Sequence, residues 1–277
     1  MLRVLFSSRM LAFHALVLLV VPSFIALGMW QYGRWEVKAA AADLQEANLT
    51  ASPVPLAQVT EVGGEVRRED RWRTVTATGE YDTGNEMLVR NRDGSGGVGL
   101  HVVTPLVTDD GAAVLVNRGW VPQPPSSAQQ PEVPRAPEGE VTVTGRVQFG
   151  ETPENTGIRP REGLPEGQIM IIDLDEIGRE LPYPLYGGYV ELTAQDPPSD
   201  PAPEVVSPPE TNTGMNLSYA VQWWVFAVIA VVGWFFLMRK EVQDSRNAGG
   251  EDGPGGDGGG GGPQRPLPTP AEPSATS

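Results

Sequence analysis

The sequence predicts a membrane protein in which two transmembrane α-helices flank an extracytoplasmic, mainly antiparallel β-sheet domain with a few short helices (α+β). Two apolar stretches, residues 10–30 and 219–238, are each about 20 residues long, the length that a helix needs to cross a bilayer core. Between them the chain alternates apolar and polar residues in short runs, as half-buried strands do. The sequence contains no cysteine, so the domain must be stabilised by its core alone.

Basic residues next to the apolar stretches predict the orientation of the chain, because such residues stay in the cytoplasm. Those outside the two stretches are Arg3, Arg9, Arg239, Lys240 and Arg246. Arg34 and Lys38 follow the first stretch and favour the opposite orientation. The cluster after the second stretch and the even number of spans favour an N-in, C-in protein. We expect cytoplasmic segments at residues 1–9 and 239–277, with the main domain outside.

The first apolar stretch could instead be a cleaved signal peptide, since Ala26-Leu27-Gly28 loosely resembles a cleavage site. Its apolar run is long for a signal peptide, and it ends in Trp30, Tyr32 and Trp35, an aromatic belt typical of a retained span. No Arg- and Ser-rich presequence precedes it, as mitochondrial import would require. We therefore expect a multi-pass protein of the bacterial plasma (inner) membrane, in contact with the lipid bilayer.

The central region is strongly acidic. The whole chain has a formal net charge of −15, whereas residues 39–218 carry 28 acidic residues against 12 arginines and no lysine, which gives −16. This charge argues against nucleic-acid binding, which requires a basic face. The acidic surface can be simply solvated, or it can dock a basic partner.

The segment after the first stretch, residues 31–70, is predicted to be a helical extension and linker. Residues 39–48 favour a helix that Pro53 and Pro55 end, and residues 55–59 favour a short second helix. The β-rich domain follows at residues 71–196. Its expected strands are residues 72–81, 86–91, 97–107, 112–120, 141–149, 168–172 and 189–194.

Turn and capping signals connect these strands into a sandwich or a partly open barrel. Asp110-Gly111 predicts a hairpin, because glycine supplies the positive φ of a tight turn. Asp173 is placed to cap a short helix over residues 173–181. Residues 122–137 form a Pro-rich loop, and residues 197–218 a Pro-rich linker. From Asn247 onward the tail is Gly, Pro and acid, and such a segment stays disordered.

The end of the first stretch carries the first recognisable motif. Trp30, Arg34 and Lys38 are spaced by four residues and share one face of a helix. That face can meet lipid headgroups, the folded domain or a partner.

Several segments together resemble the surfeit locus protein 1 family, whose members are membrane-bound assembly factors for cytochrome c oxidase. Residues 27–34 read L-G-x-W-Q-x-x-R, residues 114–122 read VLVNRGWVP, and residues 219–223 read Y-A-x-x-W. Smaller matches lie at Gly79-Glu80-Tyr81, Asn91-Arg92 and Thr104-Pro105-Leu106. The resemblance covers residues 27–238 in order. The candidate motif or partner-docking residues are Gly28, Trp30, Gln31, Arg34, Asn91, Arg92, Asn117, Arg118, Gly119, Trp120 and Tyr219.

These motif residues have both structural and functional interpretations. Gly79, Gly99 and Gly119 fit positions of close packing or bulges in strands. Arg118 and Trp120 can pair within the domain, or they can dock a partner or a porphyrin propionate.

The resemblance implies a chaperone-like role without turnover in maturation of haem A-containing cytochrome c oxidase. It implies haem A delivery or stabilisation of the catalytic subunit, with that subunit and the haem A synthesis machinery as partners. The sequence contains no catalytic triad, Walker loop or HExxH motif, so we do not expect an enzyme. A rival interpretation is an extracytoplasmic ligand or envelope-stress sensor anchored by two spans.

Haem A is a possible transient cofactor, again by resemblance. The family's candidate iron ligand is a histidine in the pattern N-H-L-x-Y-A, and Asn216 stands at that position here. His14, inside the first stretch, can ligate haem iron, but it can also snorkel or bond to the other helix. Met215 is another conceivable ligand. His101 lies on an expected strand and is expected to be packed or surface-exposed.

Overall fold

The computed structural model describes residues 8–124, 131–159, 161, 163–211 and 213–248. The chain divides into two compact units, one of residues 1–30 and 219–277 and the other of residues 31–218. The expected N-terminal cytoplasmic segment (residues 1–7 of it), the core of the 122–137 loop (residues 125–130) and the expected disordered tail from residue 249 lie outside the described residues.

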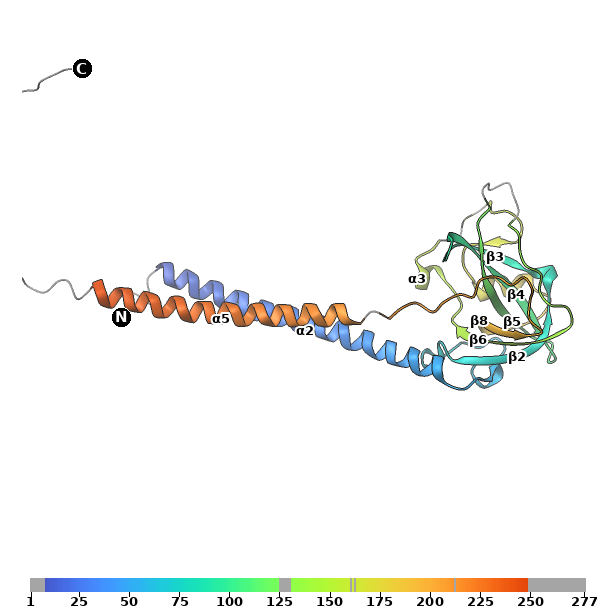
Figure 1. Ribbon diagram of the computed structural model, residues 1–277, viewed down its shortest axis with the longest axis horizontal. Coiled ribbons are helices and arrows are strands. Elements are labelled where there is room, and N and C mark those ends of the chain that lie inside the picture. The colour runs from blue at the N-terminus through green and yellow to red at the C-terminus, as the bar shows by residue number, and fades with distance from the viewer. Residues whose placement is uncertain (1–7, 125–130, 160, 162, 212, 249–277) are drawn as a thin grey trace, which may run out of the picture. The chain divides into compact units, whose positions relative to one another are not determined.

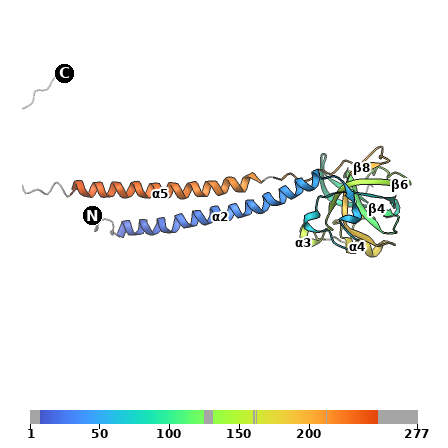
Figure 2. The same cartoon turned by 90° about the horizontal axis from the view of Figure 1, so that it is seen from below.

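Two long helices, α2 (Ser8–Thr50) and α5 (Gly214–Ala248), contain the apolar stretches. Each is long and apolar enough to cross a membrane, and each apolar segment is almost entirely exposed in the isolated chain. Within the first unit the two helices lie side by side and run antiparallel (Figures 1 and 2). Both helices are therefore consistent with a membrane-anchored protein. Helix α2 also continues without a break beyond its apolar segment, because the first prolines after it are Pro53 and Pro55.

The second unit is built on one eight-stranded sheet in the order β1-β2-β6-β8-β5-β4-β3-β7, with an additional pairing of β2 with β4. Its strands are β1 (Val54–Pro55), β2 (Thr74–Tyr81), β3 (Met87–Gly94), β4 (Gly97–Thr108), β5 (Ala113–Pro122), β6 (Glu140–Gln148), β7 (Gln168–Ile169) and β8 (Leu185–Asp196). Short helices join them: η1 (Leu56–Gln58), η2 (Arg68–Asp70), η3 (Thr83–Asn85), α3 (Pro153–Thr156) and α4 (Leu174–Glu180).

The sheet is mixed, which corrects the expectation of a mainly antiparallel sheet. Strands β1 and β2, β3 and β7, and β5 and β8 pair in parallel. The parallel pairing of β5 with β8 results from the path of β8, which follows the crossover through α4 and inserts between β6 and β5. It runs antiparallel to β6 and parallel to β5. Alternation along each strand does not reveal this order.

Five strands close into a ring, β2-β6-β8-β5-β4, because residues 79–81 of β2 pair with residues 106–108 of β4. Gly79 permits this closure: a Cβ atom there would lie 2.2 Å from the carbonyl oxygen of Val107. Apolar side chains from all five strands form the main core, including Val75, Leu106 and Val190. The ring is the barrel alternative expected from the sequence.

A second core covers the other face of β3, β4, β5 and β8 with helix α4 and the segment around Ile172. Asp173 caps α4 as expected, since its Oδ1 accepts from the backbone N–H groups of Asp175 and Glu176, each at 3.0 Å. The expected strand 168–172 is only β7, and Ile171 and Ile172 lie buried beyond it.

Two strands are longer than expected because bulges interrupt their patterns. Strand β3 continues past Asn91, which has φ 57° at a shift in register. Strand β8 begins at Leu185 rather than at Tyr189, because Gly187 and Gly188 lie where its register against β5 shifts. Each bulge breaks the strict alternation by which a strand is recognised in a sequence.

Candidate functional site

The candidate site nearest the apolar segments is the helix junction, which we define as Gln31 and Lys38 of α2 with Asn216 of α5. Gln31 and Lys38 lie seven residues apart and share one face of α2. The Nδ2 amide of Asn216 donates to Gln31 Oε1 at 2.9 Å, and Lys38 Nζ donates to Asn216 Oδ1 at 2.9 Å. Both ends of the Asn216 amide are therefore bonded to α2.

Four candidate residues near the ends of the apolar segments are exposed. Trp30, Arg34, Lys38 and Tyr219 all present their side chains to the surface. Among the three residues predicted to share a helix face, Lys38 contacts Asn216. The rings of Tyr32 and Trp35 stack nearby with centroids 5.3 Å apart.

The paired apolar segments pack through small residues and aromatic rings. A Cβ atom on Gly28 would lie 2.3 Å from Trp224 Nε1, so only glycine lets the indole approach α2 this closely. Ala220 and Ala227 are buried, and the Phe24 ring lies 5.5 Å from that of Trp223. Small residues at helix contacts are typical of association within membranes.

His14 contacts the other helix of this pair. The indole Nε1 of Trp234 donates to His14 Nδ1 at 2.9 Å, which is the interhelical bond weighed as an alternative to haem ligation. His14 lies sixteen residues before Trp30, so roughly 24 Å of helix separates it from the other end of the apolar segment.

The Asn-Arg-Gly-Trp block lies inside the domain, and its arginine is the largest fully buried side chain. Arg118 is 1% exposed; its Nη1 donates to Glu86 Oε2 at 2.8 Å and its Nη2 to the carbonyl oxygen of Pro134 at 2.8 Å. Thr104 Oγ1 also donates to Glu86 Oε2, at 2.9 Å. The guanidinium lies over the ring of Tyr81, 5.6 Å from its centroid. Arg118 is thus paired within the domain.

Tyr81 shares this buried environment. Burial raises the pKa of the Tyr81 phenol well above its usual range, and the nearby Arg118 charge opposes that rise only in part. The phenol therefore remains a neutral donor, and its Oη bonds to Gln195 Oε1 at 2.9 Å.

The remaining motif residues meet around β3, β4 and β5. Arg92 pairs with Glu151 at 2.5 Å, and Glu151 also accepts from the backbone N–H of Ile172. The indole of Trp120 donates to the carbonyl oxygen of Arg92 at 3.0 Å. The Trp120 ring leaves no room for a side chain at Gly99, because a Cβ atom there would lie 2.5 Å from the ring.

Asn117 bonds to His101, the histidine expected to be packed or exposed, which is buried on β4. Their side-chain nitrogens, Asn117 Nδ2 and His101 Nδ1, are 3.0 Å apart. Burial, with a smaller contribution from the positive charge of Arg92, lowers the pKa of His101 to about 4. The imidazole is therefore neutral at pH 7, and Asn117 donates to it.

Residues 197–209, which we name the strap, are bound to the domain rather than forming a free linker. The backbone N–H of Trp120 donates to the Glu204 carbonyl at 2.7 Å, and the Glu204 N–H donates back at 2.9 Å. The guanidinium of Arg146 donates to the Val206 carbonyl, and Gln45 of α2 donates to the Pro209 carbonyl at 3.2 Å. The strap thereby connects β5, β6 and α2.

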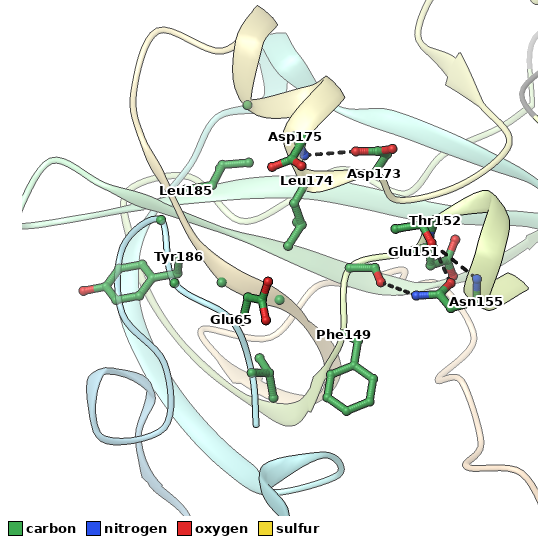
Figure 3. A pocket seen from close by; sticks show the side chains of 17 residues that line it. Glu65, Phe149, Glu151, Thr152, Asn155, Asp173, Leu174, Asp175, Leu185 and Tyr186 are labelled. Carbon is green, nitrogen blue, oxygen red and sulfur yellow. Dashed lines mark hydrogen bonds between the residues drawn. The ribbon is translucent and has the colours of Figure 1, made fainter. Parts of the chain in front are cut away.

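A cavity of about 480 Å³ lies between the segment around Glu65, the end of β6 and the start of α4 (Figure 3). Figure 3 shows Glu65 and Phe149 facing this space, with Leu174 above them. Its described lining includes six glycines and four acidic residues but no lysine or arginine.

The comparisons with known proteins identify the family. The model of the SURF1 family matches residues 18–228, which include the whole domain and part of each apolar segment. The chain belongs to the SURF1 family.

Its relatives in this family come from bacteria and eukaryotes. An uncharacterized SURF1-like protein of Mycobacterium tuberculosis is 32% identical over 239 residues, covering 84% of this chain and 85% of the relative. A SURF1-like protein of Monosiga brevicollis is 29% identical over 245 residues, covering 82% and 88%. Surfeit locus protein 1 of Homo sapiens is 33% identical over 165 residues, covering 50% and 52%.

Several residues that complete these sites have no signal in the sequence. Glu86 and Glu151, the partners of Arg118 and Arg92, are two of 28 acidic residues in the region 39–218. The contact of Asn216 with Gln31 spans 185 positions. The one sequence signal at Asn216 is its departure from the family pattern.

Proposed function

We propose that this SURF1 family member assists maturation of haem A-containing cytochrome c oxidase, without turnover of a substrate. The observation that carries the proposal is the extent of the family match, residues 18–228, which includes the domain and part of each apolar helix. The proposed partners of this chain are the catalytic subunit of the oxidase and the enzymes that make haem A.

We also place the chain in the bacterial plasma membrane, with both ends in the cytoplasm and the β domain outside. The two candidate spans and the basic residues that flank them support this orientation. A reporter fused after Ala248 should be active only in its cytoplasmic form, and one inserted after Gly139 only in its exported form. The opposite pattern would refute the orientation.

Gene deletion with complementation tests the assembly role. Membranes of the deletion strain should lose haem A absorbance and oxidase activity, and expression of the full chain should restore both. The matched control is Glu80→Gln, an exposed acid on β2 that is not one of the candidate motif or partner-docking residues and should complement fully. Normal oxidase in the deletion strain would contradict the proposal.

A second candidate function, an extracytoplasmic ligand sensor, is favoured by the cavity of Figure 3. Its volume of about 480 Å³ lies within the usual range of ligand sites, about 300–1,000 Å³. Such sites are mostly apolar, however, whereas this lining is rich in glycine and carboxylates. Under the assembly proposal, Glu65→Gln should leave oxidase activity unchanged. Under the sensor proposal, Glu65→Gln should change the response of the cell to the sensed ligand, and oxidase should remain normal in the deletion strain.

A further inference from the structure

The helix junction bears on how this chain takes part in oxidase maturation, and the inference rests on the proposed function. Assembly can proceed by holding haem A or by acting on the protein subunit. Holding the haem iron at the junction would require a ligand there, such as an imidazole or a thioether.

The residue at the corresponding position does not fit an iron ligand. Asn216 has a carboxamide in place of an imidazole, and both ends of this amide are already bonded, to Gln31 and Lys38 at 2.9 Å each. Releasing the amide would break both bonds and leave the Lys38 ammonium without its contact to Asn216.

The two histidines of the sequence have other positions and other partners. His14 lies roughly 24 Å along α2 from Trp30 and accepts from Trp234. His101 is buried in the sheet of the domain, where its Nδ1 accepts from Asn117. Neither imidazole belongs to the helix junction.

The geometry of the junction instead suits a mechanical role. Gln31 and Lys38 are two turns apart on one face of α2, about 10 Å along its axis, and Asn216 bonds to both from the first turn of α5. The half-buried amide therefore fixes the start of α5 along α2. One donor and one acceptor on the same side chain are needed to satisfy both partners.

We propose that Asn216 is a positioning residue that clasps α5 to α2, and that this chain promotes oxidase maturation without ligating haem iron at the helix junction. The partner that it acts on is the protein subunit rather than a haem that it carries there. The exposed thioether of Met215, 60% accessible, is the one neighbouring side chain in α5 whose sulfur could stand in for the missing imidazole.

Absorption spectra of the purified full chain test the absence of a haem ligand at the junction. The protein is co-expressed with haem A synthesis, as wild type, Asn216→Leu, Met215→Leu and His14→Ala. Wild type should carry no stoichiometric haem A, and its spectrum should match those of Met215→Leu and His14→Ala. Stoichiometric haem A in wild type that is lost in Met215→Leu would overturn the proposal, and so would haem retained in all variants except Asn216→Leu.

Complementation of the deletion strain tests the clasp. Asn216→Asp keeps the acceptor for Lys38, and Gln31 can turn its amide to donate to the new carboxylate, so this variant should restore oxidase. Asn216→Leu removes both bonds and should fail to restore oxidase while accumulating in membranes to the wild-type level. Full restoration by Asn216→Leu would refute the positioning role.

The two proposals fail in different ways. Normal oxidase in the deletion strain refutes the assembly role whatever the spectra show. Loss of oxidase in that strain, combined with haem A bound by the wild-type chain at the junction, leaves the assembly role intact and refutes only this inference.

Discussion

Glu86→Gln should destabilise the domain strongly, because it removes the counterion of a fully buried arginine. The Arg118 side chain is 1% exposed and forms an ion pair with Glu86 at 2.8 Å. The Glu86 side chain is 21% exposed. Removing one partner of a buried pair costs about 3–5 kcal/mol. The Pro134 carbonyl still accepts from Arg118, and water can reach the position of Glu86, so we expect about 3 kcal/mol.

Thermal unfolding of the detergent-solubilised full chain, followed by the β-sheet circular dichroism signal, measures this loss. For a domain of this size, about 3 kcal/mol lowers Tm by roughly 6–12 °C. The control Glu80→Gln removes an exposed carboxylate and should change stability by less than about 0.5 kcal/mol.

A double substitution distinguishes the effect of leaving the Arg118 charge unpaired from other effects of changing Glu86. Arg118→Met combined with Glu86→Leu removes both charges and should recover most of the stability lost in Glu86→Gln, because an apolar pair avoids the cost of burying charge. A Tm for Glu86→Gln within 2 °C of the Glu80→Gln value would refute the reasoning, since Arg118 would then have another counterion.

Three further predictions concern single positions in the domain, each measured by unfolding of the full chain. Gly119→Ala should destabilise by at least about 2 kcal/mol and release the strap, seen as faster proteolysis within it, because φ is 136° and a Cβ would lie 2.4 Å from a strap carbonyl; unchanged proteolysis would contradict this. Gly178→Ala should stabilise α4 by about 0.5–1 kcal/mol, since its Cβ meets only ordinary contacts at 3.5 Å, and a lower Tm would count against it. His101 has a pKa of about 4 in the folded domain against 6.5 when unfolded, so it contributes up to about 3 kcal/mol of stability that is fully present above pH 6.5 and is lost as the pH falls towards 4. The variant His101→Gln should therefore show a weaker dependence of stability on pH. An equal slope in both proteins would exclude His101 as the source of this dependence.

The sequence predicted the local elements well where apolar alternation and turn residues agree. The hairpin at Asp110-Gly111 lies between β4 and β5 as expected, with Gly111 at φ 80°, and the capped helix follows Asp173. These features depend on a few neighbouring residues. The order of strands depends on contacts far apart in the chain, so the parallel pairing of β8 with β5 was not predicted.

The candidate residues were easier to find than their surroundings. Arg118 and Trp120 were selected by resemblance, but their burial depends on Glu86 and on the strap, which no periodic pattern reveals. Alternation fails at Arg118 itself, because the register of β5 against β4 shifts there and the arginine occupies a bulge.

The closed ring of strands limits how another protein can bind this domain. A partner that binds by adding a strand needs a long exposed edge with free N–H and C=O groups. Beside the ring, the described part of the sheet ends in two strands of only two residues each, β1 and β7, and β1 contains Pro55, which has no N–H group. An extended segment of a partner therefore gains at most a two-residue backbone ladder on β1 or β7, so recognition at these two ends of the sheet depends on side chains and loops.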